Sequence, residues 1–218
     1  MNLDTIKNRD KKIDLARRMS KRVKDGDVIG FGSGSTSYLT VIEIAKEIEK
    51  RGIKIKAVPT SIEIEGLCKK LKIPLTTLTE EKLDWCFDGA DEVDPNNWLI
   101  KGKGAAMFRE KINFVNCEEI YVLVDDSKKV RVLGEKESVP IEVFPAAVNY
   151  VKRELEKFNI KEVTLREKDT KIISTDNGNY ILDVKFKEIT ENLEKELKKI
   201  VGVIETGLFI NYNVNILT

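Results

Sequence analysis

A loop rich in glycine and hydroxyl groups, Gly30–Thr36, lies between a short apolar run and a predicted helix. Glycine lets the backbone approach an anion closely, and the amides at a helix N-terminus carry partial positive charge. The hydroxyls of Ser33, Ser35 and Thr36 add donors, so the loop suits a phosphate monoester. It lacks the lysine of a Walker A motif, and Ser35 stands where a dinucleotide fingerprint has glycine. A tight turn with a helix cap is the alternative interpretation.

Acidic residues follow another apolar run, in the segment DGADEVD (88–94). In an open parallel sheet, ligands bind at the carboxyl ends of the strands. Asp88 and Asp91 could there hydrogen-bond sugar hydroxyls or hold a metal ion. The spacing does not match an EF-hand loop. A solvated acidic turn is the alternative.

A basic turn, Lys101-Gly102-Lys103-Gly104, precedes a helix predicted at about 105–116. Two lysines beside exposed backbone amides can stabilise an oxyanion. A basic loop that only caps the helix is the alternative.

Glu110 lies near the edge of a wide apolar arc on that helix, which predicts a largely buried element. A carboxylate in apolar surroundings has a raised pKa, which would suit a general base. The alternative is an ion pair with Arg109, Lys111 or Lys103.

The chain of 218 residues contains no histidine. This excludes a Ser-His-Asp triad, a Cys-His pair and any metal site with histidine ligands. Proton transfer must therefore use carboxylate, lysine, tyrosine, cysteine or water.

The elements that must position these residues alternate between strand and helix over the first part of the chain. Strands are predicted at 28–31, 53–58, 83–87 and 120–124, and helices at 3–24, 36–50, 59–71 and 105–116. This alternation indicates an α/β fold with a parallel sheet.

The pattern changes after about residue 128. Strands are predicted at 139–143, 163–167, 171–174 and 180–186, with helices at 145–158 and 190–200 and a turn at Asn177-Gly178. This order indicates a small antiparallel α+β unit. The apolar segments 203–210 and 214–217 could rejoin the first sheet.

Composition narrows the class of protein. Lysine and arginine number 38 and aspartate and glutamate 37, so the net charge of +1 gives no support for a nucleic-acid or membrane partner. Three scattered cysteines argue against a disulfide framework or a zinc site. Without an apolar leader or a long apolar stretch, we expect a cytoplasmic protein.

Seven segments in order resemble the ribose-5-phosphate isomerase family, type A. They are GFGSGST (30–36), DGADEVD (88–94), KGKGAAMFREKI (101–112), DSKK (126–129), VPIEVFP (139–145), TDNGNYILDV (175–184) and ETGLF (205–209). The resemblance implies a Rossmann-like domain, residues 1–128 plus 203–218, and an inserted small α+β (ferredoxin-like) domain, residues 129–202. It also implies an aldose–ketose isomerase without metal or nucleotide cofactor, and a homodimer or homotetramer.

The resemblance assigns roles to residues that match the family motifs. Glu110 corresponds to the base, Asp88 and Asp91 to the acidic-loop aspartates, and Lys101 to the loop lysine. Substrate binding falls to Ser33, Gly34, Ser35, Thr36, Gly89, Ala90, Gly102, Lys103, Gly104, Lys128 and Lys12. Many members have glycine where this chain has Lys103, and that extra cation contacts either the substrate or only the surface.

Other classes of protein compete with this interpretation. A sugar-phosphate sensor on a similar fold usually carries a DNA-binding helix-turn-helix, and only the 27 residues before position 28 are available for one. A CoA transferase or an amino-sugar phosphate deaminase would be another enzyme of related fold. A plain dinucleotide-binding domain is disfavoured by Ser35.

Overall fold

In a computed structural model, which describes residue 1 and residues 3–218, the chain divides into two compact units. The first unit comprises residues 1–89, 109–127 and 213–218. The second comprises residues 90–108 and 128–212.

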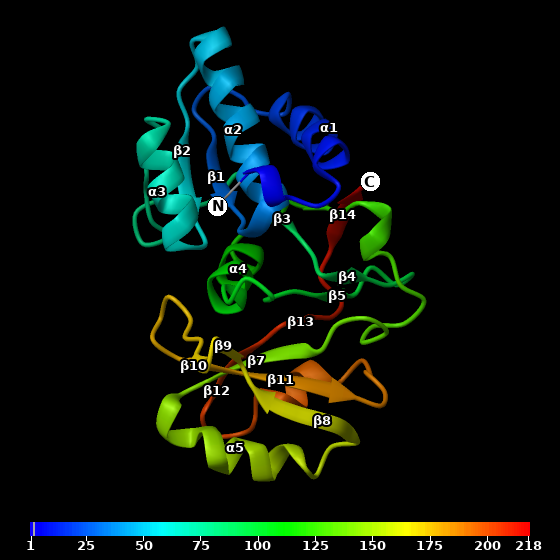
Figure 1. The fold of residues 1–218 in the computed structure, drawn as a ribbon. Coiled ribbons are helices and arrows are strands. Elements are labelled where there is room, and N and C mark those ends of the chain that lie inside the picture. Colours follow the sequence, from blue (N-terminus) through cyan, green and yellow to red (C-terminus); the bar gives the residue numbers. More distant parts are fainter. Residues whose placement is uncertain (2) are drawn as a thin grey trace. The chain divides into compact units, whose positions relative to one another are not determined.

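The first unit is built on a five-stranded sheet in which every neighbouring pair of strands is parallel (Figure 1). Its spatial order is β14-β6-β3-β1-β2, from strands β1 (Val28–Phe31), β2 (Lys56–Pro59), β3 (Trp85–Gly89), β6 (Ile120–Leu123) and β14 (Val214–Leu217). Chain order reverses between β1 and β3. A doubly wound sheet of this order binds ligands outside the carboxyl ends of its strands at that reversal.

The helical elements of the first unit are η1 (Leu3–Thr5), α1 (Arg9–Ser20), α2 (Gly34–Arg51), α3 (Ile62–Lys70) and η2 (Asp126–Lys128), whose last residue falls in the second unit. Helix α4 (Met107–Val115) begins in the second unit and ends in the first. The end of α2 and the start of α3 have clear sequence signals. Gly52 ends α2 in the left-handed conformation, with φ +64°. The Ser61 hydroxyl accepts a hydrogen bond from the Ile64 amide and so caps α3.

The core of the first unit lies against the sheet and is partly aromatic. Phe31 and Phe87, both fully buried, have ring centroids 5.2 Å apart, and Trp85 lies 6.0 Å from Phe87. The two phenylalanines are paired across β1 and β3. Aromatic burial therefore fixes the register of the two strands that flank the switch point.

The second unit is an antiparallel α+β structure. Its four-stranded sheet has the order β12-β7-β11-β8, from β7 (Val139–Val143), β8 (Ile160–Leu165), β11 (Tyr180–Phe186) and β12 (Val203–Thr206), with η3 (Pro145–Ala147), α5 (Val148–Leu155) and α6 (Leu193–Leu197). Along the chain this is β-α-β-β-α-β, which confirms the predicted ferredoxin-like architecture.

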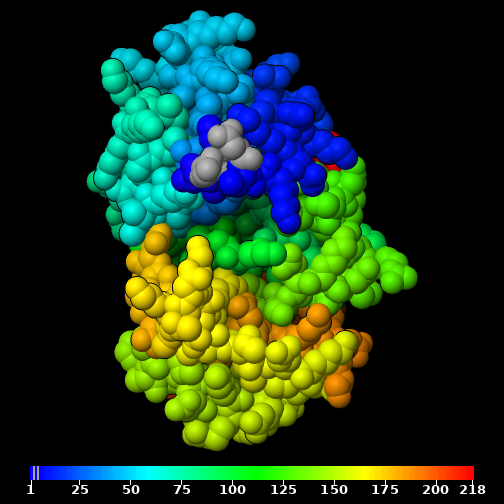
Figure 2. All heavy atoms as spheres, viewed as in Figure 1, coloured from blue at the N-terminus to red at the C-terminus, as the bar shows by residue number. Residues whose placement is uncertain are grey.

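Two smaller sheets complete the second unit. One is antiparallel in the order β13-β5-β4, from β4 (Glu92–Val93), β5 (Leu99–Ile100) and β13 (Leu208–Phe209). The other is a hairpin of β9 (Glu167–Lys168) and β10 (Lys171–Ile172), whose residues are all exposed. Figure 2 shows this hairpin, in yellow and orange, at the surface.

The units divide at positions that differ from the predicted domain bounds. Residues 90–108 and 203–212 group with the second unit. The reason is strand pairing, because β12 pairs with β7 and β13 with β5. Of the two C-terminal apolar segments, only 214–217 joins the parallel sheet, where β14 pairs with β6.

Within the described residues, no helix is both long and apolar enough to cross a membrane.

Candidate active site

The loop after β1 forms the N-terminal end of α2. Ser33 is the N-cap residue, yet its side chain makes no capping bond. Its hydroxyl instead lies 2.7 Å from the Thr60 hydroxyl, which follows β2. Gly34 has φ +83°, a conformation that favours glycine. The amides and hydroxyls of this loop thus form a helix N-terminus suited to an anion, and helix capping alone does not explain its hydroxyls.

Lys12 brings a cation to the same loop from α1. Its side chain is buried, at 8% exposure, and its ammonium donates a 2.8 Å hydrogen bond to the Ser35 hydroxyl. An ammonium beside this helix N-terminus adds to its positive charge and favours an anion there, while the same charge also lowers the pKa of Asp125. The placement of Lys12 therefore agrees with the predicted role in holding a phosphate.

Asp88 is the penultimate residue of β3 and is held against the loop after β1. Its carboxylate Oδ1 accepts hydrogen bonds from the Ser33 amide (3.0 Å), the Ser37 hydroxyl (3.1 Å) and the Gly89 amide (2.7 Å). The residue is 1% exposed. A buried carboxylate with several donors keeps one orientation. Asp88 and the predicted phosphate loop therefore meet at the switch point of the sheet.

Glu110 lies on α4 and is 4% exposed, which confirms that this carboxylate is buried. One turn later on the same face, the Asn113 side-chain amide donates to the Val58 carbonyl on β2, at 3.1 Å. This bond fixes the C-terminal part of α4 to the sheet of the first unit. The role of Glu110 as a base stays a prediction.

Asp91 and Lys101 are predicted site residues of the second unit. The Asp91 amide donates to the Ile100 carbonyl at 2.8 Å, and its carboxylate Oδ2 accepts from the Lys103 amide at 2.9 Å. Burial raises the pKa of Asp91, although the Lys103 amide and the charges of Lys101 and Lys128 oppose the shift.

Lys101 itself is buried, at 2% exposure. Its amide donates to the Gly207 carbonyl at 2.8 Å, and its ammonium lies 5.7 Å from the centre of the Phe209 ring. A Cβ on Gly207 would lie only 2.1 Å from the Lys101 carbonyl oxygen. Glycine in the ETGLF segment is therefore required for β13 to approach the lysine loop this closely.

The backbone and the side chain of Lys103 have different partners. The backbone amide holds Asp91, while the ammonium pairs with both carboxylate oxygens of Glu137, at 2.6 and 2.8 Å. The Lys103 side chain is 63% exposed. Gly102 has φ +99° and Gly104 has open space around it. Contact of these residues with a substrate stays a prediction, as it does for Lys128, which is half-buried at the end of η2.

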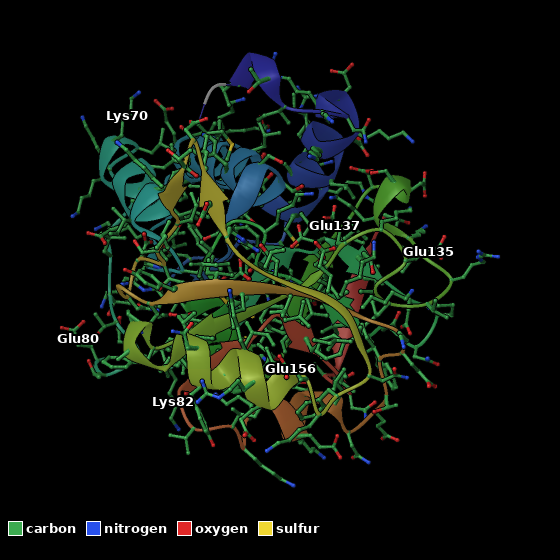
Figure 3. All side chains as sticks on the ribbon, turned by 60° about the horizontal axis from the view of Figure 1, so that its bottom comes forward. Lys70, Glu80, Lys82, Glu135, Glu137 and Glu156 are labelled. Atoms are coloured by element: carbon green, nitrogen blue, oxygen red, sulfur yellow. The ribbon has the colours of Figure 1, made fainter. Side chains whose placement is uncertain are left out.

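Several residues that hold the site were not predicted. In the first unit they are Ser37 and Thr60, which position Asp88 and Ser33. In the second unit Glu92, fully buried, accepts hydrogen bonds of 2.6–2.7 Å from the amides of Gly134, Lys136 and Glu137. Figure 3 labels Glu135 and Glu137 on that loop. The position of Thr60 just after β2 was an available signal, because polar residues there meet the switch point.

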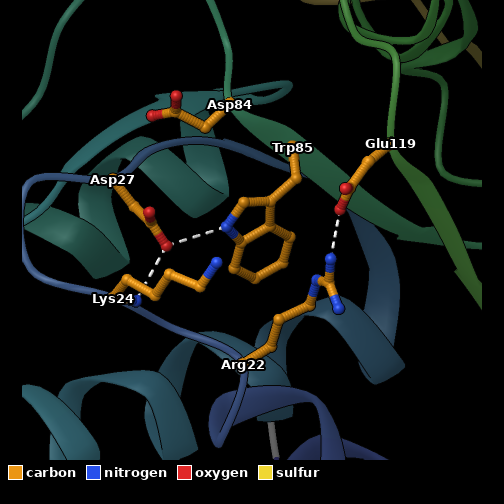
Figure 4. A pocket seen from close by; sticks show the side chains of 6 residues that line it. All are labelled: Arg22, Lys24, Asp27, Asp84, Trp85 and Glu119. Atoms are coloured by element: carbon orange, nitrogen blue, oxygen red, sulfur yellow. Dashed lines mark hydrogen bonds and ion pairs between the residues drawn. The ribbon is translucent and has the colours of Figure 1, made fainter.

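A different polar pocket, with a volume of about 150 Å³, lies at the amino-terminal edge of the parallel sheet (Figure 4). Three carboxylates line this pocket, and each comes directly before a strand: Asp27 before β1, Asp84 before β3 and Glu119 before β6. Asp27 accepts from the Trp85 indole and the Lys24 amide, and Glu119 pairs with Arg22. These carboxylates bind protein groups, so the pocket is a structural junction at the edge opposite to the predicted site.

The fold and these residues define a class: a doubly wound α/β protein with an anion-type loop and a buried carboxylate at its switch point, carrying a ferredoxin-like insertion. Residues 56–218 match the family model of ribose 5-phosphate isomerase A (phosphoriboisomerase A). The chain belongs to this family.

Known proteins support the assignment over almost the whole chain. Ribose-5-phosphate isomerase A 1 of Oceanobacillus iheyensis is 45% identical, covering 90% of this chain and 88% of the relative. A solved ribose 5-phosphate isomerase A from Methanocaldococcus jannaschii is 42% identical with a TM-score of 0.92, covering 97% of this chain and 96% of that one. A D-ribose-5-phosphate isomerase solved with phospho-erythronic acid is 38% identical with a TM-score of 0.90, covering 99% and 95%. The predicted family and fold, and with them the enzyme class isomerase, are confirmed.

Proposed function

We propose that this chain interconverts D-ribose 5-phosphate and D-ribulose 5-phosphate through a cis-enediolate, a reaction of the non-oxidative pentose phosphate pathway. One observation carries the proposal beyond family membership. Asp88 is hydrogen-bonded to the loop Ser33–Thr36 and to the first turn of α2, which supports a site that combines a carboxylate with a loop suited to an anion. The relative solved with phospho-erythronic acid supports a phosphorylated sugar as the class of ligand.

The phosphate group binds the loop Ser33–Thr36, with Lys12 supplying a positive charge and Lys128 a second one. These contacts are remote from the carbons that react. Their binding energy holds the sugar in register and lowers the entropy cost of reaching the transition state.

Glu110 is the base in this proposal. Its carboxylate removes the proton from C2 of the open-chain aldose, and the same group, now protonated, returns a proton to C1. The buried position of Glu110 on α4 supports this role, because a dehydrated carboxylate is a stronger base than one in water.

Two other groups manage the oxygen atoms. Negative charge develops on O1 as the proton leaves C2, and the Lys101 ammonium with the amides of Gly102–Gly104 stabilises it. Asp88 assists ring opening and carries the proton from O2 to O1, which completes the conversion to the ketose. Asp91, with the backbone of Gly89 and Ala90, orients the sugar hydroxyls. No step needs histidine or a metal ion.

The decisive experiment is conversion of ribose 5-phosphate to ribulose 5-phosphate by the purified chain, with and without a chelator. We expect activity that the chelator leaves unchanged. Glu110→Gln should lower kcat by orders of magnitude with little change in substrate binding. If that variant isomerises at near the parental rate, Glu110 is not the base.

The alternative functions would give different results in related assays of the same purified protein. In heavy water an isomerase of this mechanism exchanges the C2 proton of ribose 5-phosphate with solvent. A CoA transferase would instead form a thioester on Glu110, detectable by mass spectrometry after incubation with an acyl-CoA. A sensor without catalysis would bind the sugar phosphate and exchange no proton.

Assembly into a homodimer or homotetramer is a further proposal. Phe144 and Val201 expose 54% and 75% of their surface, and the Phe144 amide bonds the Gly202 carbonyl, so the two apolar side chains come from joined segments. An exposed apolar surface of this kind supports association. Sedimentation of the chain and of Val201→Glu would test it, with a monomeric parental protein contradicting the proposal.

A further inference from the structure

Arg166 links the ferredoxin-like sheet to the loop that carries the predicted catalytic lysine. It follows β8 directly, and its backbone is held on both sides. The Arg166 amide donates to the Ile181 carbonyl at 2.8 Å, and the Arg166 carbonyl accepts from the Ile173 amide at 3.0 Å. The side chain is 16% exposed. The backbone from which the Arg166 side chain extends is therefore held in place.

Asp183 on β11 fixes the plane of the Arg166 guanidinium. Nε donates to Oδ2 at 2.8 Å and Nη2 donates to Oδ1 at 2.5 Å. This is the bidentate pairing that a guanidinium forms with a carboxylate and that an ammonium cannot reproduce. The remaining nitrogen, Nη1, is thereby aimed in one direction.

Nη1 is directed at the backbone of the lysine loop. It donates to the Gly102 carbonyl at 2.9 Å and to the Lys103 carbonyl at 3.2 Å. The Gly102 carbonyl also accepts from the Ala105 amide at 3.0 Å, which closes a tight turn. Gly102 has φ +99°, which glycine adopts readily, but Ala105 has φ +62°, which costs energy for a residue with a side chain, so bonds from outside help to hold this turn.

The far side of the same turn holds Asp91. The peptide between Gly102 and Lys103 presents its carbonyl to Arg166 and its amide to the Asp91 carboxylate, at 2.9 Å. One peptide plane therefore carries the orientation of Arg166 to Asp91, because the peptide unit is rigid. Lys101 is the residue directly before this turn.

We infer that Arg166, clamped by Asp183, is a positioning residue that holds the 101–104 turn and, through it, Asp91 and Lys101 in their reactive placement. The inference rests on the proposed function, since it assigns the two positioned groups to the isomerase reaction. Arg166 itself contacts neither the sugar nor the reacting atoms.

The test is steady-state kinetics of Arg166→Lys on the full chain with ribose 5-phosphate. The lysine keeps the charge but loses the fork, so the turn loses its two-point support. We expect kcat to fall roughly 10- to 100-fold, the size of effect that a small misplacement of reacting groups produces. Inhibition by inorganic phosphate should change less than about twofold, because Arg166 bonds none of the proposed phosphate ligands Ser33–Thr36, Lys12 and Lys128. General destabilisation of the protein would instead lower kcat and weaken inhibition by phosphate together.

Arg22→Lys is the matched control, because Arg22 also pairs with a carboxylate, Glu119, but touches no predicted site residue. It should keep the parental kcat. Asp183→Asn provides a second route should Arg166→Lys not fold, since it loosens the same guanidinium while keeping the shape of the pair. Faster amide exchange in the 101–105 peptide of either variant, with β11 unchanged, would report the loosened turn directly.

The outcomes separate the two proposals. An active parental protein whose Arg166→Lys or Asp183→Asn variant keeps kcat within about twofold overturns the positioning role. A folded but inactive parental protein overturns the proposed function instead. In that case unchanged exchange of the 101–105 amides in the variants would overturn the clamp as well.

Discussion

The Asp88 carboxylate packs so closely against Gly32 that a side chain on residue 32 would clash with it. A Cβ placed on Gly32 would lie 2.2 Å from the Asp88 Cγ and Oδ1. The Gly32 amide also donates to the Phe87 carbonyl at 2.9 Å, so the backbone cannot easily retreat. Gly32, which directly follows β1 in this loop, is therefore glycine because the Asp88 carboxylate of the neighbouring strand β3 lies against it.

Gly32→Ala should displace Asp88 and lower activity on ribose 5-phosphate by roughly 10²-fold, because the carboxylate loses its register with the loop. Overpacking should also cost about 1–3 kcal/mol in the free energy of unfolding. Gly66→Ala is the control, since Gly66 lies within α3 with open space around it. That change should stabilise the protein by about 0.5–1 kcal/mol and keep activity. Enzyme assays and urea unfolding measure both, and a fully active Gly32→Ala would contradict the argument.

Lys12→Met should weaken phosphate recognition while leaving the fold intact, because methionine keeps most of the buried stem. The lost charge-assisted contact corresponds to about 1.5–3 kcal/mol, or roughly 10- to 100-fold in affinity for inorganic phosphate. Lys11→Met is the neighbouring control, since Lys11 is 66% exposed and pairs with Asp126. Competition by inorganic phosphate against ribose 5-phosphate measures the effect. Equal inhibition constants of phosphate for the two variants would show that Lys12 does not contribute to phosphate binding.

Local sequence signals predicted the strands and helices well where short-range patterns decide them. The predicted strands 28–31, 139–143 and 180–186 have the observed bounds. The strand predicted at 53–58 begins only at Lys56, because the Lys54 backbone bonds Gly26 and Asp25 in a turn instead of a neighbouring strand. The helix predicted at 3–24 is shorter, Arg9–Ser20, with Asn8 left-handed at its start. These differences come from tertiary hydrogen bonds that a local pattern cannot contain.

The same limit applies to the site. Glycines, carboxylates and lysines in compact segments could be recognised, because each segment brings its own chemistry. Arg166 could not, since its partners Gly102 and Lys103 are more than sixty residues away and no local pattern distinguishes it from other surface arginines. The pairing of β12 with β7 likewise depends on long-range contacts, and the predicted bounds had assigned 203–210 to the Rossmann-like domain instead.

The cysteines should differ in reactivity. Burial, with the nearby charge of Glu65, raises the pKa of the Cys68 thiol to about 12. A hydrogen bond from Cys86 lowers the pKa of Cys117, which is partly exposed. Because the thiolate is the nucleophile, iodoacetamide should modify Cys117 more than about tenfold faster than Cys68 in the folded protein. Peptide mass spectrometry measures the rates, and similar labelling of both without denaturant would contradict this expectation.

Asp91 and Asp125 should give stability opposite dependences on pH. Burial raises the pKa of Asp91 above its ordinary 3.8. Burial also acts on Asp125, but hydrogen bonds from Ser127 and the charge of Lys12 outweigh it and lower its pKa. A raised carboxyl pKa makes the folded state hold its proton longer, so stability falls as pH rises from the unfolded to the folded pKa. A lowered pKa adds stability above the unfolded value, which is lost as pH falls.

Substitution by asparagine removes each titration and should therefore reveal its sign. Relative to the parental protein, Asp91→Asn should gain stability as pH rises from about 3 to 7, since the penalty of ionising a buried carboxyl disappears. Asp125→Asn should lose relative stability over the same range, since the favourable ionised form is gone. Urea unfolding at a series of pH values measures both, and each variant serves as the control for the other. If the two variants gave the same dependence of unfolding free energy on pH, the pKa values of the two carboxyls would not be shifted in opposite directions. Burial would then not raise the pKa of Asp91.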